Sequence, residues 1–337
     1  MKNAVVLFAL VLAVPLHAAN YHVVRHIPVG GAGGWDYLTV DDTQRRLFLS
    51  HGTEVDVVNL ASGKKVGVID KLEGVHGIAI APDLGRGYIS NGRSNMVTVF
   101  DLPTLKRVAD WKATGDNPDA ILYDRTSKRL LTFNGRGKNA TVFDARSGDV
   151  VATIDIGGKP EFAVAKGNGT VYANVEDTNE VVEIDVKNAK VVRRWPLAGC
   201  DSPSGLAYDM KNGRLFSVCE NKVMAISDAK AGKIMTTVPI GAGTDGAAFD
   251  PSSKTAFSAN GADGTITVVR EVAPGKFEAV DTIQTAKGTR TIVLDERTHH
   301  LYTPTAKFGA TPEPTAERPH PRPAIEPDTF EVLDIAP

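Results

Sequence analysis

Seven residues, most of them ionisable, recur at nearly equal spacing along the chain. They are Asp36, His76, Asp119, Glu161, Ser204, Asp245 and Arg290, and successive members lie 40 to 45 residues apart. Four carboxylates, an imidazole and a guanidinium can together bind a cation or a polar organic ligand if the fold gathers them in one place. Their chemistry therefore depends on the elements that carry them.

Each of the seven residues is the second residue of a short strand-like run inside a repeated unit of about forty residues. The copies of this run are 35–41, 75–80, 118–124, 160–164, 203–209, 244–250 and 289–295. A period in the forties, with alternating strand residues separated by Gly, Asn, Asp and Pro turns, is typical of propeller blades. The sequence predicts an all-β, seven-bladed β-propeller with four-stranded blades.

The two ends of the chain are expected to close the ring. The seventh unit has predicted strands at 290–295, 300–303 and 330–335 and then stops. The segment 21–29 matches the outermost-strand pattern of 190–197 and 233–240. We expect this N-terminal strand to complete the last blade, which removes an open sheet edge.

In a propeller the first strand of each blade lies nearest the central channel, so the seven spaced residues should meet at the channel mouth. Trp35 lies beside Asp36 and can line the same mouth. One interpretation leaves these channel-mouth residues solvated in a water-filled tunnel. In the other they converge on a ligand, and His51, His76, Asp119 and Glu161 bind a divalent metal ion. Oxygen ligands suit Ca²⁺ or Mn²⁺, whereas imidazoles favour Zn, Fe or Cu.

One stretch of the repeat resembles a known family. Residues 88–101, YISNGRSNMVTVFD, resemble the repeat that names the YVTN-family propellers, which include the YncE-like exported proteins. Residues 257–269, FSANGADGTITVV, are similar, and weaker copies start at Leu47, Leu130, Val171 and Leu215. The resemblance implies a seven-bladed propeller outside the cytoplasm and does not specify a function.

The N-terminus also predicts export. Lys2 precedes the apolar run 4–16, and His17-Ala18-Ala19 supplies small residues for cleavage, as in a secretory signal peptide. We expect a signal peptide at 1–19, a single propeller domain at 20–337, and a periplasmic or secreted protein without a transmembrane segment in the mature chain.

Both cysteines, Cys200 and Cys219, fall in the fifth unit, and export permits a disulfide between them. The alternatives are a buried free thiol at Cys219 and a metal thiolate. One further segment departs from the repeat: a proline-rich insertion at 304–327 inside the last unit, expected to be extended and exposed. It is interpreted either as a disordered or surface flap, or as a lid over a binding site.

The composition narrows the function. The net charge is −2 and no Lys/Arg run exceeds two residues, which argues against a protein dedicated to binding duplex nucleic acid. The sequence contains no Gly-x-Ser-x-Gly and no His-Glu-x-x-His motif. We expect a monomeric, exported, non-catalytic binding module that holds a protein, an envelope component or a small molecule. The alternative is a metal-dependent hydrolase, lactonase or lyase with a divalent cation at the channel mouth.

Overall fold

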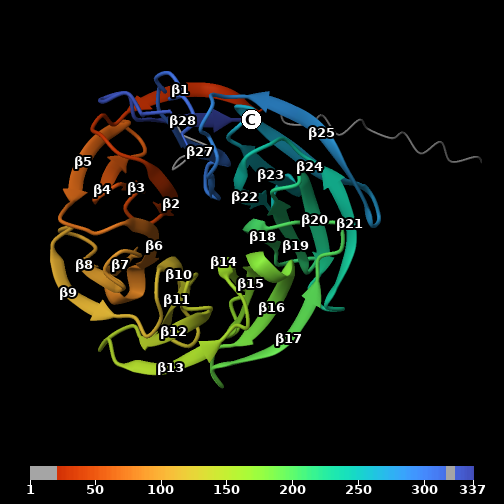
Figure 1. Ribbon diagram of the computed structural model, residues 1–337, viewed down its shortest axis with the longest axis horizontal. Helices are drawn as coiled ribbons and strands as arrows, with labels where there is room; N and C mark the ends of the chain where they lie inside the picture. Colours follow the sequence, from red (N-terminus) through yellow and green to blue (C-terminus); the bar gives the residue numbers. More distant parts are fainter. Residues whose placement is uncertain (1–20, 316–322) are drawn as a thin grey trace, which may run out of the picture.

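The computed structural model describes residues 21–315 and 323–337, which form a ring of blades around a central axis (Figure 1). Among these residues, seven four-stranded antiparallel sheets make up the ring. The predicted all-β, seven-bladed propeller is therefore confirmed. The expected signal peptide at 1–19 lies outside the described residues.

The strands of a blade follow the chain from the axis outward in blades 1 to 6. Blade 1 comprises β2 (Trp35–Asp41), β3 (Arg46–His51), β4 (Glu54–Asn59) and β5 (Lys64–Ile69). Blade 2 comprises β6 (Val75–Ala81), β7 (Arg86–Asn91), β8 (Met96–Asp101) and β9 (Arg107–Lys112). Blade 3 comprises β10 (Pro118–Asp124), β11 (Arg129–Asn134), β12 (Asn139–Asp144) and β13 (Val150–Asp155). Blade 4 comprises β14 (Pro160–Ala165), β15 (Thr170–Val175), β16 (Glu180–Asp185) and β17 (Lys190–Pro196). Blade 5 comprises β18 (Pro203–Asp209), β19 (Arg214–Cys219), β20 (Val223–Asp228) and β21 (Lys233–Pro239). Blade 6 comprises β22 (Thr244–Asp250), β23 (Thr255–Asn260), β24 (Thr265–Ala273) and β25 (Lys276–Gln284).

Blade 7 combines strands from both ends of the described chain. It comprises β26 (Val293–Asp295), β27 (His300–Thr305), β28 (Glu331–Ala336) and, outermost, β1 (His22–Pro28). Two short 3₁₀ helices, η1 (Pro82–Leu84) and η2 (Glu176–Thr178), occur in the described residues. None of the helices found there has the length or hydropathy to cross a bilayer.

Strand β1 closes the ring as predicted. It pairs antiparallel with β28 and also contacts the blades on either side. Tyr21, just before β1, packs edge-on against Phe257 of blade 6 with ring centroids 4.9 Å apart, and Ile27 is buried in the core between blades 7 and 1. The strand therefore joins three blades, which protects the edge of β28 from unwanted pairing.

The hydrophobic core lies between adjacent blades. The second strands, such as β3 and β23, are buried along their whole length because a blade covers each face. The outer strands, such as β1 and β17, alternate between exposed and more buried residues because one face meets solvent. In blade 5, Cys200 and Cys219 form a disulfide with a Cα–Cα distance of 5.5 Å.

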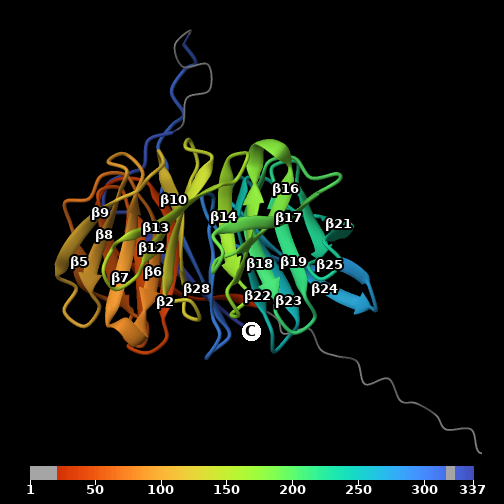
Figure 2. The ribbon, with the colours of Figure 1, turned by 90° about the horizontal axis from the view of Figure 1, so that it is seen from below.

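The proline-rich insertion begins later than predicted. Strand β27 continues through Thr305, and Pro304 pairs with Val332 of β28. A proline is tolerated here because the inner neighbour, β26, begins only at Val293, so the inner side of β27 has no pairing strand beyond Tyr302. The insertion then leaves the face that carries the starts of the innermost strands (Figure 2). Of the insertion, 316–322 lie outside the described residues.

Candidate functional site

Six of the seven spaced channel-mouth residues lie at irregularities where the innermost strands begin, whereas Arg290 precedes β26, which begins only at Val293. In blade 1, Trp35 pairs with His51 and Leu38 with Leu49, so two residues of β2 oppose one residue of β3. The same shift occurs at the starts of β6, β10, β14 and β18, and a one-residue shift occurs in β22. Because a bulge changes the direction of the side chains within it, these residues can reach across to neighbouring blades.

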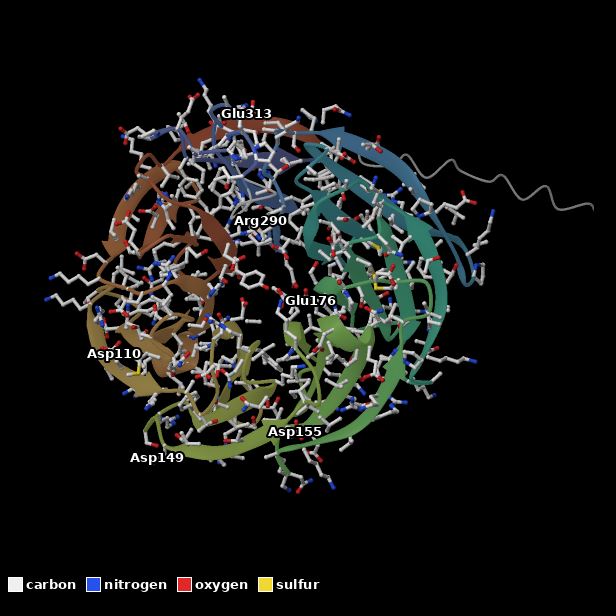
Figure 3. The ribbon with its side chains drawn as sticks, in the orientation of Figure 1. Asp110, Asp149, Asp155, Glu176, Arg290 and Glu313 are labelled. Carbon is white, nitrogen blue, oxygen red and sulfur yellow. A yellow bond between two sulfur atoms is a disulfide. The ribbon has the colours of Figure 1, made fainter. Side chains whose placement is uncertain are left out.

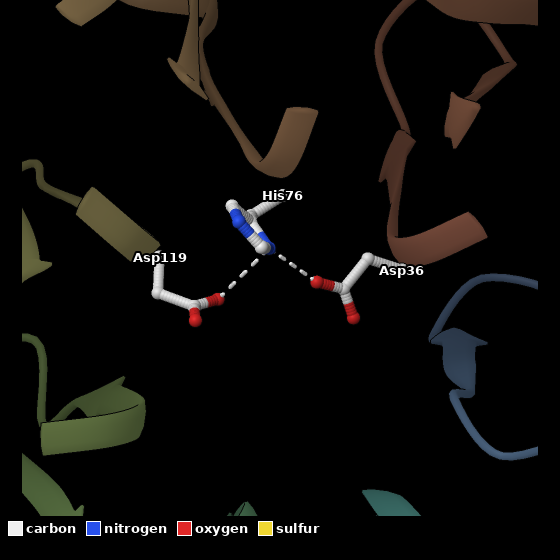
Figure 4. A group of neighbouring side chains, drawn as sticks. All are labelled: Asp36, His76 and Asp119. Atoms are coloured by element: carbon white, nitrogen blue, oxygen red, sulfur yellow. Dashed lines mark hydrogen bonds and ion pairs between the residues drawn. The ribbon is translucent and has the colours of Figure 1, made fainter. Parts of the chain in front are cut away.

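His76 stands between two carboxylates from the flanking blades (Figure 4). Its Nδ1 lies 2.7 Å from Asp36 Oδ2 and 3.4 Å from Asp119 Oδ1. One ligand atom from each of these three residues lies within 4.8 Å of the others. The opposite edge of the imidazole abuts Gly92, where a Cβ would fall 2.6 Å from Nε2. The ring is therefore held with Nδ1 toward the carboxylates.

Arg290 extends this group around the mouth and lies toward the axis in Figure 3. Its Nη1 donates to the carboxylate of Asp245, and its Nη2 donates to the backbone oxygen of Trp35 at 2.6 Å. The same Nη2 lies 3.4 Å from Asp36 Oδ1. The guanidinium therefore links blades 6, 7 and 1.

Glu161 belongs to a second part of the mouth. Lys159 Nζ lies 3.4 Å from Glu161 Oε2 and forms a closer ion pair with Glu176 of η2. Glu176 also lies toward the axis in Figure 3, whereas Asp149 and Asp155 lie at the outer rim. Lys159 and Glu176 were not predicted as site residues because they lie outside the repeated position.

Burial and mutual repulsion raise the pKa values of two mouth carboxyls. The pKa of Asp119 rises to about 7 because the group is buried and faces the charge of Asp36, and the proximity of His76 offsets only part of this. The pKa of Glu161 rises to about 9 through burial and the charge of Asp119, with Lys159 acting in the opposite direction. A cation placed among these groups would lower both pKa values.

The other side of the mouth is better neutralised. Burial raises the pKa of Asp245 to about 6, although Arg290 favours its ionised form. Burial lowers the pKa of His76, but its hydrogen bond to Asp36 and the charges of Asp119 and Asp36 outweigh that effect, so the pKa is raised. The mouth thus contains more carboxyl groups than cationic groups that could pair with them.

An aromatic pair lies deeper in the channel. Tyr37 from blade 1 meets Phe162 from blade 4, with ring centroids 5.2 Å apart in an edge-on arrangement. A cavity of about 380 Å³, lined largely by apolar residues of the innermost strands, borders both rings. The charge of Asp119 reaches Tyr37, whose pKa is raised by burial and by that charge. The pair therefore separates the charged mouth from an apolar lower channel.

The pair could have been found in the sequence. The residues that follow the seven spaced positions are Tyr37, Gly77, Ala120, Phe162, Gly205, Gly246 and Thr291. Five of these are small or of moderate size, so two large rings pointing inward from the same level of the channel would be expected to meet.

The two remaining predicted ligand-binding residues have other contacts. Ser204 Oγ lies 3.4 Å from the backbone oxygen of Thr244, which gives its hydroxyl a partner in the next blade. Trp35 is buried, and its ring packs against Phe330 at 5.4 Å and Phe308 of the insertion at 6.0 Å. Its indole therefore lies beside the mouth and under the insertion.

The structure does not place His51 with His76, which corrects the predicted four-residue metal set. His51 ends β3, one strand outward from the channel, and its Nδ1 lies 2.8 Å from Asp56 Oδ2. It belongs to a separate group with Glu54 and Asp56. A Cβ on Gly31 would fall 2.9 Å from its ring, so the glycine-rich loop 30–34 packs directly against the imidazole.

The Asp36–His76–Asp119 group offers two carboxylate oxygens and one imidazole nitrogen. Such a mixed set of oxygen and nitrogen ligands suits a divalent ion of the Mn²⁺ to Zn²⁺ series better than it suits Ca²⁺, which prefers oxygen ligands alone. Glu161 is not part of this group, although its charge and that of Asp119 influence each other. The mouth therefore contains a three-residue cation group beside a protonatable glutamate.

Fold and site together define a seven-bladed propeller with an ionisable channel mouth. Among solved structures, the chain is similar to hydrazine synthase from Kuenenia stuttgartiensis, with 18% identity and a TM-score of 0.69 over 81% of this chain and 92% of that chain. It is also similar to U3-55K, with 11% identity and a TM-score of 0.74 over 92% of this chain and 97% of that chain. At these identities the similarity shows the fold alone. No protein-family model matches the chain, and the comparison with curated proteins gives no match.

Proposed function

We propose that this protein is an exported, non-catalytic binding module of the YVTN type that acts as a monomer and binds a divalent cation at its channel mouth. The observation that carries this proposal is the grouping of Asp36, His76 and Asp119, with ligand atoms within 4.8 Å of one another. The raised pKa values of Asp119 and Glu161 indicate an excess of negative charge there that a cation would relieve. A disulfide is in keeping with an oxidising compartment outside the cytoplasm.

The test uses full-length mature protein purified without an affinity tag and stripped with chelator. Mn²⁺, Zn²⁺, Ca²⁺ and Mg²⁺ are each added, and melting temperature and bound metal are measured. An ion present at a hundred times its Kd stabilises the folded state by about 2.7 kcal/mol. For a chain of this size that amounts to roughly 5 °C.

Asp119→Asn should abolish the metal-induced shift. Asp149→Asn is the matched control, because Asp149 is an exposed carboxylate at the outer rim. Binding should also strengthen as the pH rises past about 7, since Asp119 must lose its proton to coordinate a metal. If none of the four ions stabilises the wild-type protein, the cation proposal is wrong and the mouth is only a lining of the channel.

A second candidate is a metal-dependent hydrolase, lactonase or lyase. One observation favours it: three protein ligands leave coordination positions for water and substrate, as in catalytic metal sites. Metal-loaded protein should then hydrolyse or open a lactone or ester from a test panel, and Asp119→Asn should lose that activity. Stoichiometric metal without turnover of any substrate in the panel would leave the binding module as the function.

A further inference from the structure

A second cavity, of about 250 Å³, lies between the channel mouth and the base of the insertion. Trp35 forms one wall, and Phe308, Pro323 and Ile325 of the insertion form others. The insertion is held together here by backbone hydrogen bonds, from Gly309 N to Ala324 O and from Glu326 N to Lys307 O, both 2.9 Å. The insertion residues of the cavity wall therefore come from two arms of the chain that are hydrogen-bonded to each other.

Two glycines shape this cavity. A Cβ on Gly288 would fall 2.8 Å from Phe308 and 3.0 Å from Trp35, so this glycine permits the two rings to approach. A Cβ on Gly34 would meet no atom within 4 Å, although Gly34 lines the cavity. The space above Gly34 is therefore open, and a larger side chain would fill it without a clash.

One wall residue of the cavity, Trp35, carries a polar atom that lacks a partner. The indole Nε1 of Trp35 is buried and has no hydrogen-bond acceptor among the described residues. Because a buried donor left unpaired is unfavourable, a ligand whose acceptor oxygen reaches this nitrogen would be favoured. Among the described residues that line the same cavity, only Arg290 is charged.

Arg290 connects the cavity to the cation group. Its Nη2 is 2.6 Å from Trp35 O and 3.4 Å from Asp36 Oδ1, and Asp36 Oδ2 is in turn 2.7 Å from His76 Nδ1. A ligand in the cavity would therefore meet Arg290 at the cavity wall, and in the loaded protein a metal ion would lie beyond Arg290, past Asp36. Both attract a carboxylate.

We propose that this cavity binds the ring of an aromatic carboxylate, whose carboxylate group lies between Arg290 and a cation at Asp36–His76–Asp119. The inference rests on the proposed cation binding and adds the class of ligand. A cavity of about 150 Å³ is known to accept benzene, so 250 Å³ accommodates one substituted six-membered ring. Trp35 and Phe308 supply the aromatic faces against which such a ring packs.

The experiment measures binding of benzoate to the full mature protein by saturation-transfer NMR, with and without Zn²⁺. Benzylamine and benzyl alcohol serve as the cationic and neutral probes of similar shape. Saturable benzoate binding that strengthens at least tenfold with Zn²⁺, and exceeds binding of both other probes, supports the proposal. Stronger binding of benzylamine, or benzoate binding that ignores Zn²⁺, overturns it.

Gly34→Leu fills the cavity and should weaken benzoate binding at least tenfold while leaving the Zn²⁺-induced melting shift intact. Ala231→Leu is the control, because it adds the same side chain at an exposed turn between β20 and β21. Trp35→Phe keeps a ring but removes the Nε1 donor, and should weaken benzoate binding several-fold. Zinc stabilisation without benzoate binding overturns this inference and leaves the proposed function standing. Failure of benzoate and of all four metal ions to bind removes both.

Discussion

Two histidine–carboxylate groups in this propeller use the same residue types in different surroundings. In the outer group, His51 and Asp56 are 1% and 0% exposed at their side chains, and Lys65 Nζ lies 2.5 Å from Asp56 Oδ1. In the mouth group, the side chain of His76 is 27% exposed and faces two carboxylates. The outer group is packed and has its own cation, whereas the mouth group opens to the channel with carboxylates in excess.

The packing of His51 explains why its group is structural. Phe330 stacks on the imidazole with ring centroids 4.2 Å apart, and the glycine-rich loop 30–34 covers another side. No aromatic ring stacks on His76 in the described part of the chain, and its imidazole lies against Gly92 and the flanking carboxylates. Histidine beside carboxylate thus identifies a ligand site only when the partners lack internal compensation.

The largest effect is expected from Asp56→Ala. Removing this buried carboxylate leaves His51 and Lys65 without their shared partner, and breaking a buried pair of this kind costs about 3–5 kcal/mol. The melting temperature should fall by roughly 6–10 °C, while the metal-induced shift at the mouth is retained. Glu220→Ala is the control because Glu220 is exposed and lies outside both groups. Loss of the metal response in Asp56→Ala would show that the two groups are not independent.

The second effect is a pH dependence of the free energy of unfolding, caused by the carboxyl groups of the channel mouth. The folded-state pKa values of Asp119, Asp245 and Glu161, about 7, 6 and 9, lie above those of the unfolded chain. Groups with raised pKa values contribute stability that is complete at low pH and is lost as pH rises through the folded pKa. Metal-free protein should therefore lose several kcal/mol of stability, at about 1.4 kcal/mol for each pH unit and group, between pH 5 and pH 9.

Calorimetric melts across that range, in chelator, measure this loss. Saturating metal should flatten the profile at the high end, because a bound cation stabilises the ionised carboxylates. Greater stability at pH 9 than at pH 5 in the metal-free protein would contradict the proposed crowding of negative charge.

A smaller effect is expected from Lys65→Met. The substitution keeps the approximate length of the side chain but leaves the buried Asp56 carboxylate with His51 as its remaining side-chain partner. Because Lys65 is one-third exposed, solvent screens the pair and the cost should be about 1 kcal/mol. Lys64→Met, at the exposed neighbouring position, should change the melting temperature by less than a degree. Equal effects of the two variants would mean that Lys65 does not compensate Asp56.

The fold was predictable because seven copies of one pattern reinforce each other. Even the closure could be predicted, since the pattern of 21–29 matched the outermost strands that the seventh unit lacked. The extension of β27 through Pro304 was missed because it depends on where the neighbouring strand β26 begins. That is a property of pairing, which a proline in the sequence does not reveal.

The site was predictable in part. Repeat position brought Asp36, His76 and Asp119 to one place, because equivalent residues of adjacent blades lie side by side. The sequence prediction grouped His51 with them because it ends the strand next to the innermost one. The structure places its side chain with Glu54 and Asp56 instead, and the repeat pattern does not show toward which neighbours a side chain at that position turns. Lys159 and Glu176 reach the mouth from loops, and their positions follow from loop conformation rather than from the repeat.

The smallest effect, from Asp119→Asn, separates the two groups most directly. In metal-free protein at pH 8, Asp119 is ionised and faces the charge of Asp36, so replacing it with a neutral amide should stabilise the fold by less than about 1 kcal/mol. At pH 5 the carboxyl is already protonated, and the gain should vanish. Melts of Asp119→Asn at both pH values, with Asp149→Asn as control, measure the difference. Destabilisation of Asp119→Asn at pH 8 would show that Asp119, like Asp56, holds the structure together and is not a site kept for a ligand.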